Sequence, residues 1–160
     1  MPSSRESLMA MLSQKLPRLR ALSDEFACRR PGPGKWSPKE IIGHLIDSAS
    51  NNHQRFVRAQ FTDNLVFPGY DQIAWVMTQR YNEAPWPDLV DLWFAFNRQI
   101  AHVISVMPEN QIARERMEHN LHKIAFITVP ENQPVTLGYF MDDYVAHLNH
   151  HLNQISPGES

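Results

Sequence analysis

Three of the eight histidines in this 160-residue chain stand close together near its C-terminal end, at positions 147, 150 and 151 of the stretch DDYVAHLNHHLNQI. Each residue of an α-helix turns the chain by about 100°. His147 and His151 therefore stack one turn apart and flank the apolar face of that helix, whereas His150 points toward solvent. Two imidazoles at i and i+4 form a natural pair of ligands for a divalent metal. The spacing alone leaves a partly buried polar flank as the alternative.

A third histidine, His44, lies near the start of an earlier predicted helix, in the segment EIIGHLIDS. It too stands at the edge of an apolar face. If this helix runs antiparallel to the last one, His44 shares one layer of the structure with His147 and His151. Three neutral imidazoles leave coordination positions open for water or substrate, which is typical of catalytic metal sites. We therefore predict a divalent metal at these three residues.

Two carboxylates lie one helical turn from the predicted ligands. Asp47 follows His44 by three residues and is the predicted catalytic residue, either supporting a ligand or acting as a general base. A solvated helix carboxylate is the alternative for Asp47. Asp143 precedes His147 by one turn and is expected to orient its imidazole or to lie on the surface.

Other residues of chemical interest are more ambiguous. Aromatic side chains in the predicted loops and short helix can form a substrate pocket or ordinary core, namely Trp36, Tyr70 and Trp75. His119 and His122 make a weaker candidate pair, because a connecting segment does not fix their spacing. His53 and His102 are expected to be structural or exposed. A recess for an acidic ligand has three candidate arginines, Arg55, Arg58 and Arg98.

Rigid elements must hold these side chains, and the pattern of apolar residues predicts helices. Ser37, Pro38 and Glu40 form a helix start with a capping box. Proline and glycine separate the helical blocks, and Ser156, Pro157 and Gly158 end the last one. We predict a single domain over residues 1–160 that is all-α, a four-helix bundle with short extra helices and an extended connection. The long helices are expected at 4–28, 37–60, 87–107 and 136–155, short ones at 71–80 and 109–118, and the connection, with room for a small hairpin, at 119–135.

Composition narrows the classes of function. Hydrophobic residues make up 42% and charged residues 20% of the chain, so the core needs no metal or disulfide for stability. The net charge of −2 argues against a nucleic-acid partner. No apolar stretch approaches the roughly 20 residues of a membrane-spanning helix. A single cysteine, Cys28, excludes an internal disulfide and agrees with a cytoplasmic protein.

The motif WSPKEIIGHLIDS, followed much later by YVAHLNHHLNQI, resembles the DinB-like superfamily. The resemblance covers about residues 5 to 155. It implies a four-helix bundle with up-down-down-up connectivity, often a homodimer. It also implies zinc or nickel on three histidines, which correspond here to His44, His147 and His151. Members of this superfamily include metal-dependent hydrolase-like proteins and thiol-dependent S-transferases.

Three functional hypotheses follow. The leading one is a metal-dependent enzyme that uses a low-molecular-weight thiol as an S-transferase on small electrophilic substrates. The second is a metal-dependent hydrolase, in which Asp47 matters more because water needs a base. The third is a non-enzymatic stress protein that binds a small ligand or a metal. The histidines alone do not separate the three.

Overall fold

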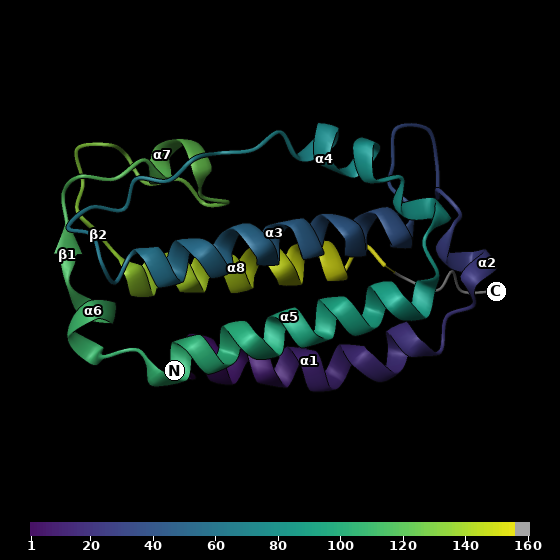
Figure 1. The fold of residues 1–160 in the computed structure, drawn as a ribbon, viewed down its shortest axis with the longest axis horizontal. Coiled ribbons are helices and arrows are strands. Elements are labelled where there is room, and N and C mark those ends of the chain that lie inside the picture. The colour runs from purple at the N-terminus through teal and green to yellow at the C-terminus, as the bar shows by residue number, and fades with distance from the viewer. Residues whose placement is uncertain (156–160) are drawn as a thin grey trace.

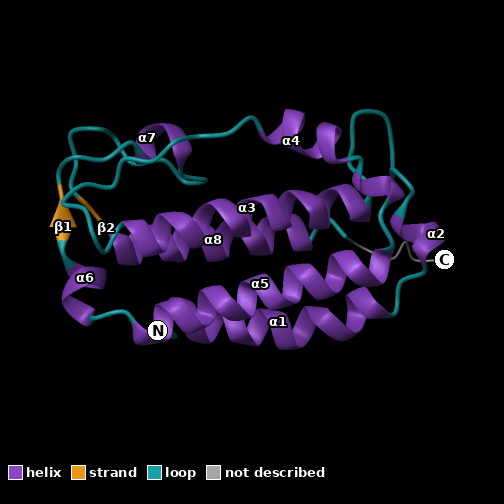
Figure 2. Cartoon of the chain, in the orientation of Figure 1, coloured by secondary structure: helices purple, strands orange, loops and turns teal. Residues whose placement is uncertain are grey.

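A computed structural model describes residues 1–155 of the protein, and four long helices form its body (Figures 1 and 2). α3 (Pro38–Arg58) packs against α5 (Trp86–Val106) and α8 (Leu137–Leu152), and α1 (Ser4–Arg20) packs against the same two helices. α1 and α8 run in one direction and α3 and α5 in the other, so the connectivity is up-down-down-up (Figure 1). The predicted all-α four-helix bundle is confirmed.

Short elements connect the long helices. The predicted connection at 119–135 contains a one-turn helix, α7. The small hairpin considered within this connection does not form there. Instead, two short strands that flank the connection pair antiparallel, β1 (Glu115–Arg116) and β2 (Val135–Thr136), with Glu115 opposite Thr136. The remaining elements are α2 (Asp24–Ala27), α4 (Gln72–Gln79), the 3₁₀ turn η1 (Tyr81–Glu83), α6 (Glu109–Ala113) and α7 (Leu121–Ile124).

The first predicted helix is wrong in its extent. α1 ends at Arg20, and Ser23 starts a separate helix by accepting a hydrogen bond from the backbone N–H of Phe26. An N-cap serine competes with continuation of a helix, because its side chain satisfies a free N–H at a new start. Pro17 lies inside α1. The predicted helix stop at 156–158 lies outside the described residues.

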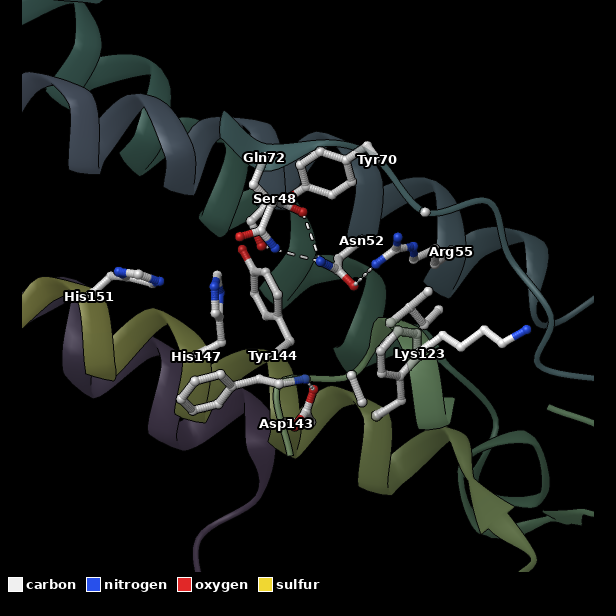
Figure 3. Close-up of a pocket in the computed structure, with 15 residues that line it drawn as sticks. Ser48, Asn52, Arg55, Tyr70, Gln72, Lys123, Asp143, Tyr144, His147 and His151 are labelled. Atoms are coloured by element: carbon white, nitrogen blue, oxygen red, sulfur yellow. Dashed lines mark hydrogen bonds between the residues drawn. The ribbon is translucent and has the colours of Figure 1, made fainter. Parts of the chain in front are cut away.

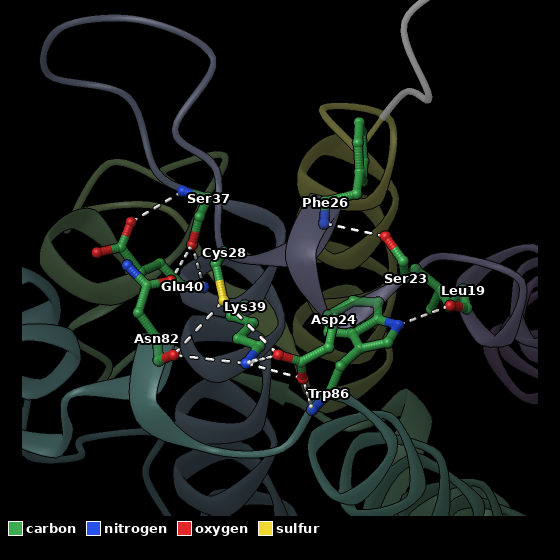
Figure 4. A network of polar contacts seen from close by, with 10 residues as sticks. All are labelled: Leu19, Ser23, Asp24, Phe26, Cys28, Ser37, Lys39, Glu40, Asn82 and Trp86. Atoms are coloured by element: carbon green, nitrogen blue, oxygen red, sulfur yellow. Dashed lines mark hydrogen bonds and ion pairs between the residues drawn. The ribbon is translucent and has the colours of Figure 1, made fainter.

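The start of α3 has a complete capping box, as predicted. The Ser37 hydroxyl accepts the backbone N–H of Glu40 at 3.2 Å, and the Glu40 carboxylate accepts the backbone N–H of Ser37 at 2.8 Å (Figure 4). Pro38 occupies the first turn. This reciprocal cap satisfies two N–H groups that a helix start otherwise leaves free. His44 therefore follows a rigid helix start.

A partly buried polar network ties the start of α3 to α2 and α5. The ammonium of Lys39, which is buried, contacts the carboxylate of Asp24 at 3.0 Å (Figure 4). The same carboxylate accepts the backbone N–H of Trp86 at 2.9 Å, at the first residue of α5. The Trp86 indole donates to the carbonyl of Leu19 at 2.8 Å. Four segments are thus fixed at the end of the bundle where His44 lies.

Within the described residues, no helix combines the length and the apolar character needed to cross a membrane. The apolar side chains of the long helices instead fill the interior of the bundle. Phe56 of α3, Trp93 of α5 and Leu148 of α8 are all fully buried there. The bundle therefore has a continuous core that holds α3 and α8 in register.

Candidate metal centre

Three histidine side chains converge between α3 and α8. His44 comes from α3, and His147 and His151 come from α8. One ring nitrogen of each lies within 4.8 Å of the others, and Nε2 of His44 is 3.1 Å from Nε2 of His147. His44 is fully buried, His147 and His151 are half-buried, and His150 is exposed. The antiparallel arrangement predicted to join the three ligands is present.

The arrangement fits a divalent metal. In a tetrahedral site with Zn–N bonds of about 2.0–2.1 Å, neighbouring ligand nitrogens lie about 3.3 Å apart, close to the His44–His147 separation. The second nitrogen of His44, Nδ1, is buried and has no hydrogen-bond partner in the described chain. The His151 ring is oriented by Gln154, whose Oε1 lies 3.0 Å from Nδ1. Imidazole ligands suit zinc and nickel alike.

The environment keeps the imidazoles neutral. Burial is the largest cause that lowers the pKa of His44 to about 4 and the pKa of His147 to about 3, with neighbouring imidazoles as the second cause. Burial also lowers the pKa of His151. A metal binds only unprotonated imidazole. The triad therefore presents free lone pairs at neutral pH without first releasing protons.

Asp47 has a defined environment behind the triad. Its Oδ1 accepts hydrogen bonds from the Tyr81 hydroxyl at 2.6 Å and from Nε2 of Gln79 at 2.8 Å. Its Oδ2 is buried without a partner among the described residues, and burial raises the pKa of the carboxyl. Asp47 does not line the cavity next to the triad. Its catalytic role stays a prediction, and its contacts anchor η1 to α3.

Gly43 allows the Tyr81 ring to pack closely against the backbone of α3. A Cβ atom at this position would lie 2.1 Å from the Tyr81 ring. Only glycine lets the ring pass this near to the helix backbone. The glycine next to His44 therefore has a packing role that its place in EIIGHLIDS did not reveal.

A cavity of about 370 Å³ opens onto two histidines of the triad, His147 and His151 (Figure 3). His147 and His151 stand at one end, and polar residues of α3 continue along its wall. The volume lies within the usual range for small-molecule sites. The lining consists of Ser48, Asn52, Arg55, Gly69, Tyr70, Gln72, Lys123, Ile124, Ala125, Phe126, Phe140, Asp143, Tyr144, His147 and His151.

Asp143 neither orients His147 nor lies on the surface, so both expectations for it are wrong: its side chain is buried. Its carboxylate accepts the backbone N–H groups of Phe126 and Ile127, at 2.9 and 2.6 Å. Tyr139 adds a hydrogen bond from its hydroxyl to the carbonyl of Ile127 at 2.7 Å. The Phe126 ring consequently lies against His147, with 5.4 Å between ring centroids. Asp143 thus holds the connection at 119–135 against the triad at His147, a role that no local sequence signal indicated.

The predicted aromatic residues divide among three roles. Tyr70 lines the cavity. Trp36 packs on His44, with 5.1 Å between ring centroids, and shields the triad from one side. Trp75 packs on Tyr70 and is 38% exposed, so it supports the cavity wall from outside.

The other histidines do not assemble a second site. Nε2 of His119 lies 2.8 Å from the carbonyl oxygen of Gln133, and its Nδ1 accepts the backbone N–H of Leu121. Both nitrogens of His119 are therefore occupied, which removes the candidate pair with His122. His53 is half-buried and His102 is exposed. Within residues 1–155, the triad is the one cluster of His, Cys, Asp or Glu side chains with convergent ligand atoms.

The three candidate arginines also separate. Arg55 is buried and lines the cavity. Arg58 is exposed near the end of α3 and lines only a second surface depression, which Arg55 also borders. Arg98 is exposed on α5, where its guanidinium lies 5.8 Å from the centroid of the Phe94 ring.

Comparison with known proteins agrees with this description. A sequence model of the DinB superfamily matches residues 10–155. The chain belongs to the DinB superfamily. The family expected from the two histidine motifs is therefore confirmed. A search of curated protein sequences gave no significant match.

A solved structure shares the four-helix bundle fold. YfiT from Bacillus subtilis, described as a probable metal-dependent hydrolase with an unusual four-helix bundle topology, is 18% identical and superposes with a TM-score of 0.74. The match covers 97% of this chain and 86% of YfiT. At this identity the likeness establishes the fold.

Proposed function

We propose that this DinB protein is a metal-dependent enzyme whose metal is held by His44, His147 and His151, and that it acts as a thiol-dependent S-transferase on small electrophiles. One observation carries the proposal: the cavity beside the triad ends on two of the three histidines. A purely structural metal site is closed by protein ligands, whereas a catalytic one keeps access for substrate. The description of YfiT as a probable metal-dependent hydrolase supports metal dependence.

The reaction joins a thiol to an electrophilic carbon. A bound divalent metal would supply Lewis acidity. It would lower the pKa of a sulfhydryl group, so that the thiolate forms at neutral pH. In the transfer, the sulfur forms a new S–C bond, the leaving group departs with the bonding electron pair, and the thiol proton passes to solvent. Zinc and nickel are both candidates for the metal.

Aromatic side chains cover the triad, limit the access of water to it and shape the cavity. Trp36 packs on His44, and Phe126 packs on His147. Phe126 is held in place by the bond from its backbone N–H to Asp143. The Tyr144 hydroxyl, which is buried, donates to Oδ1 of Asn97 at 2.6 Å and is thereby committed to the core. These contacts keep the cavity wall rigid around the reacting end.

The carboxylates favour transfer over hydrolysis. Metal-dependent hydrolases commonly place a carboxylate as general base within reach of the attacking water. Asp47 lies outside the cavity lining, and Asp143, which is in the lining, accepts two backbone N–H groups. A thiol needs no such base once its pKa is lowered. Hydrolysis remains the second candidate because Oδ2 of Asp47, one turn from His44, has no partner in the described chain.

A turnover screen tests the proposal. Metal-loaded protein is incubated with small thiols and alkyl or aryl electrophiles, and with esters and amides, beside the His147→Ala variant. The expected result is a thioether product that requires the thiol and is lost in His147→Ala. Asp47→Asn should retain most transferase activity, with Tyr81→Phe as the matched control for the lost hydrogen bond. Thiol-independent ester or amide cleavage that Asp47→Asn abolishes would establish the hydrolase instead.

The expected homodimer and the cytoplasmic location are part of the same proposal. A small-thiol transferase operates where reduced thiols are abundant, and the single cysteine agrees with such a compartment. Light scattering on the purified protein measures the oligomeric state directly.

A further inference from the structure

Arg55 is a buried cation without a protein countercharge. It is 6% exposed, and no carboxylate of the described chain lies within ion-pair distance of its guanidinium. Its two protein acceptors are neutral: the carbonyl of Pro68 at 3.0 Å and Oδ1 of Asn52 at 3.4 Å. Burial lowers the pKa of the guanidinium. Proteins seldom bury an arginine without an anionic partner.

The guanidinium is held in a fixed position at the cavity wall. Its carbon lies 5.9 Å from the ring centroid of Tyr70 and 5.9 Å from that of Phe140. Both aromatic residues line the same cavity, and Figure 3 shows Tyr70 at its wall. Nη1 and Nη2 of Arg55 each donate one hydrogen bond to the protein, so three of the five N–H groups of the guanidinium remain for a planar anion.

Arg55 and the triad occupy the two ends of one polar stripe. His44, Ser48, Asn52 and Arg55 recur at helical spacing along α3, so they share a face. The stripe covers three turns, about 16 Å along the helix axis. Figure 3 shows Arg55 at the end of the cavity away from His147 and His151. A small molecule in this cavity therefore contacts the triad with one end and approaches Arg55 with the other.

We propose that Arg55 binds a carboxylate of the substrate and so fixes which small molecules place a reactive group at the triad. Lys123, exposed at the rim of the cavity, adds a second positive charge on the same side (Figure 3). Asp143 is the acidic side chain of the lining, and its oxygens already accept two backbone N–H groups. This inference deepens the proposed function. It rests on that function for one point, namely which group of the substrate reacts at the triad.

The test measures anion preference by calorimetry, with and without metal. The probes are mercaptopropionate, mercaptohexanoate and mercaptoundecanoate, each beside the mercaptoalcohol of equal length, and the corresponding carboxylates and alcohols that lack sulfur. The proteins are wild type, Arg55→Gln, Arg55→Lys and, as the matched control, Arg58→Gln. Arg58 is the exposed arginine that follows on the same helix and does not line the cavity. Circular dichroism verifies that each variant is folded.

The expected result is about tenfold or greater preference for carboxylate over alcohol at one or more chain lengths, because a charge-assisted hydrogen bond is replaced by a weaker neutral one. Arg55→Gln should remove the preference, Arg55→Lys should keep part of it, and Arg58→Gln should keep all of it. A wild-type protein without the preference, or a preference that survives in Arg55→Gln, overturns the inference.

The measurements with and without metal separate this inference from the proposed function. The ligands with and without sulfur show whether the carboxylate belongs to the thiol or to the electrophile. A preference that depends on Arg55 in metal-free protein, with no metal bound under any condition, supports the anion site while the metal-dependent function fails. If metal enhances binding of the mercaptocarboxylates alone, the carboxylate belongs to the thiol. If carboxylates without sulfur bind equally well beside a bound mercaptoalcohol, it belongs to the electrophile.

Discussion

Replacing Gly43 with alanine should destabilise the protein, although the same change usually stabilises a helix. Alanine in a helix interior gains about 1 kcal/mol over glycine. Here the new methyl group would lie 2.1, 2.3 and 2.4 Å from three ring atoms of Tyr81, so the ring must move. Tyr81 is 7% exposed and donates to the carboxylate of Asp47, and its movement breaks that bond.

The magnitude follows from these contacts. Overpacking of a buried site costs about 1–3 kcal/mol, and loss of a hydrogen bond to a charged group costs about 1.5–3 kcal/mol. After the gain in helix propensity, the net loss for Gly43→Ala is about 1.5–5 kcal/mol. The assay is urea unfolding of metal-free protein, followed by circular dichroism at constant pH.

A double-mutant cycle isolates the contact. In a Tyr81→Ala background the ring is absent, so Gly43→Ala should change sign and stabilise by about 1 kcal/mol. If Gly43→Ala leaves the wild-type protein as stable as before, or if its effect is the same in both backgrounds, the packing argument at Gly43 is refuted.

Two further predictions concern the cover of the site and its protonation. Asp143→Asn should cost about 1–3 kcal/mol and speed amide hydrogen exchange at Phe126 and Ile127, measured by mass spectrometry, because the carboxylate accepts both N–H groups. Metal-free protein should lose stability as the pH falls from about 6.5 toward about 4, since burial lowers the pKa of His44 and His147 in the folded chain. In this window the unfolded chain binds protons that the folded chain does not, so unfolding is favoured. Urea unfolding at several pH values measures the slope.

Each of these predictions has its own control. Asp142→Asn changes an exposed neighbour of Asp143 and should leave exchange at Phe126 and Ile127 unaltered. Equal exchange in Asp143→Asn and wild type would contradict the role of Asp143. His147→Leu should flatten the pH slope, and stability that is constant or rises on acidification would contradict neutral buried imidazoles.

The sequence was sufficient for features that depend on neighbouring residues. Ser37 and Glu40 predict their cap because both partners lie within one helical turn. The turn of about 100° per residue places His147 and His151 inward and His150 outward, as the structure does. The two histidine motifs also indicated the superfamily, and with it the antiparallel placement of α3 and α8.

Features made by contacts between distant segments could not be predicted in this way. Asp143 accepts N–H groups from Phe126 and Ile127, which belong to a connection without periodic pattern. Tyr81 reaches Asp47 because of the close approach at Gly43. Such contacts depend on how loops fold back over the bundle, and loop conformation leaves little local signal.

Metal content, measured by mass spectrometry on tag-free protein beside His44→Ala and His147→Ala, tests the central claim most directly. The two residues come from different helices, and their Nε2 atoms are 3.1 Å apart. The account predicts near-stoichiometric zinc or nickel in the wild type and its loss in both variants, with the helical signal retained. Absence of metal after reconstitution, or metal that persists in either variant, would contradict a metal centre shared by α3 and α8.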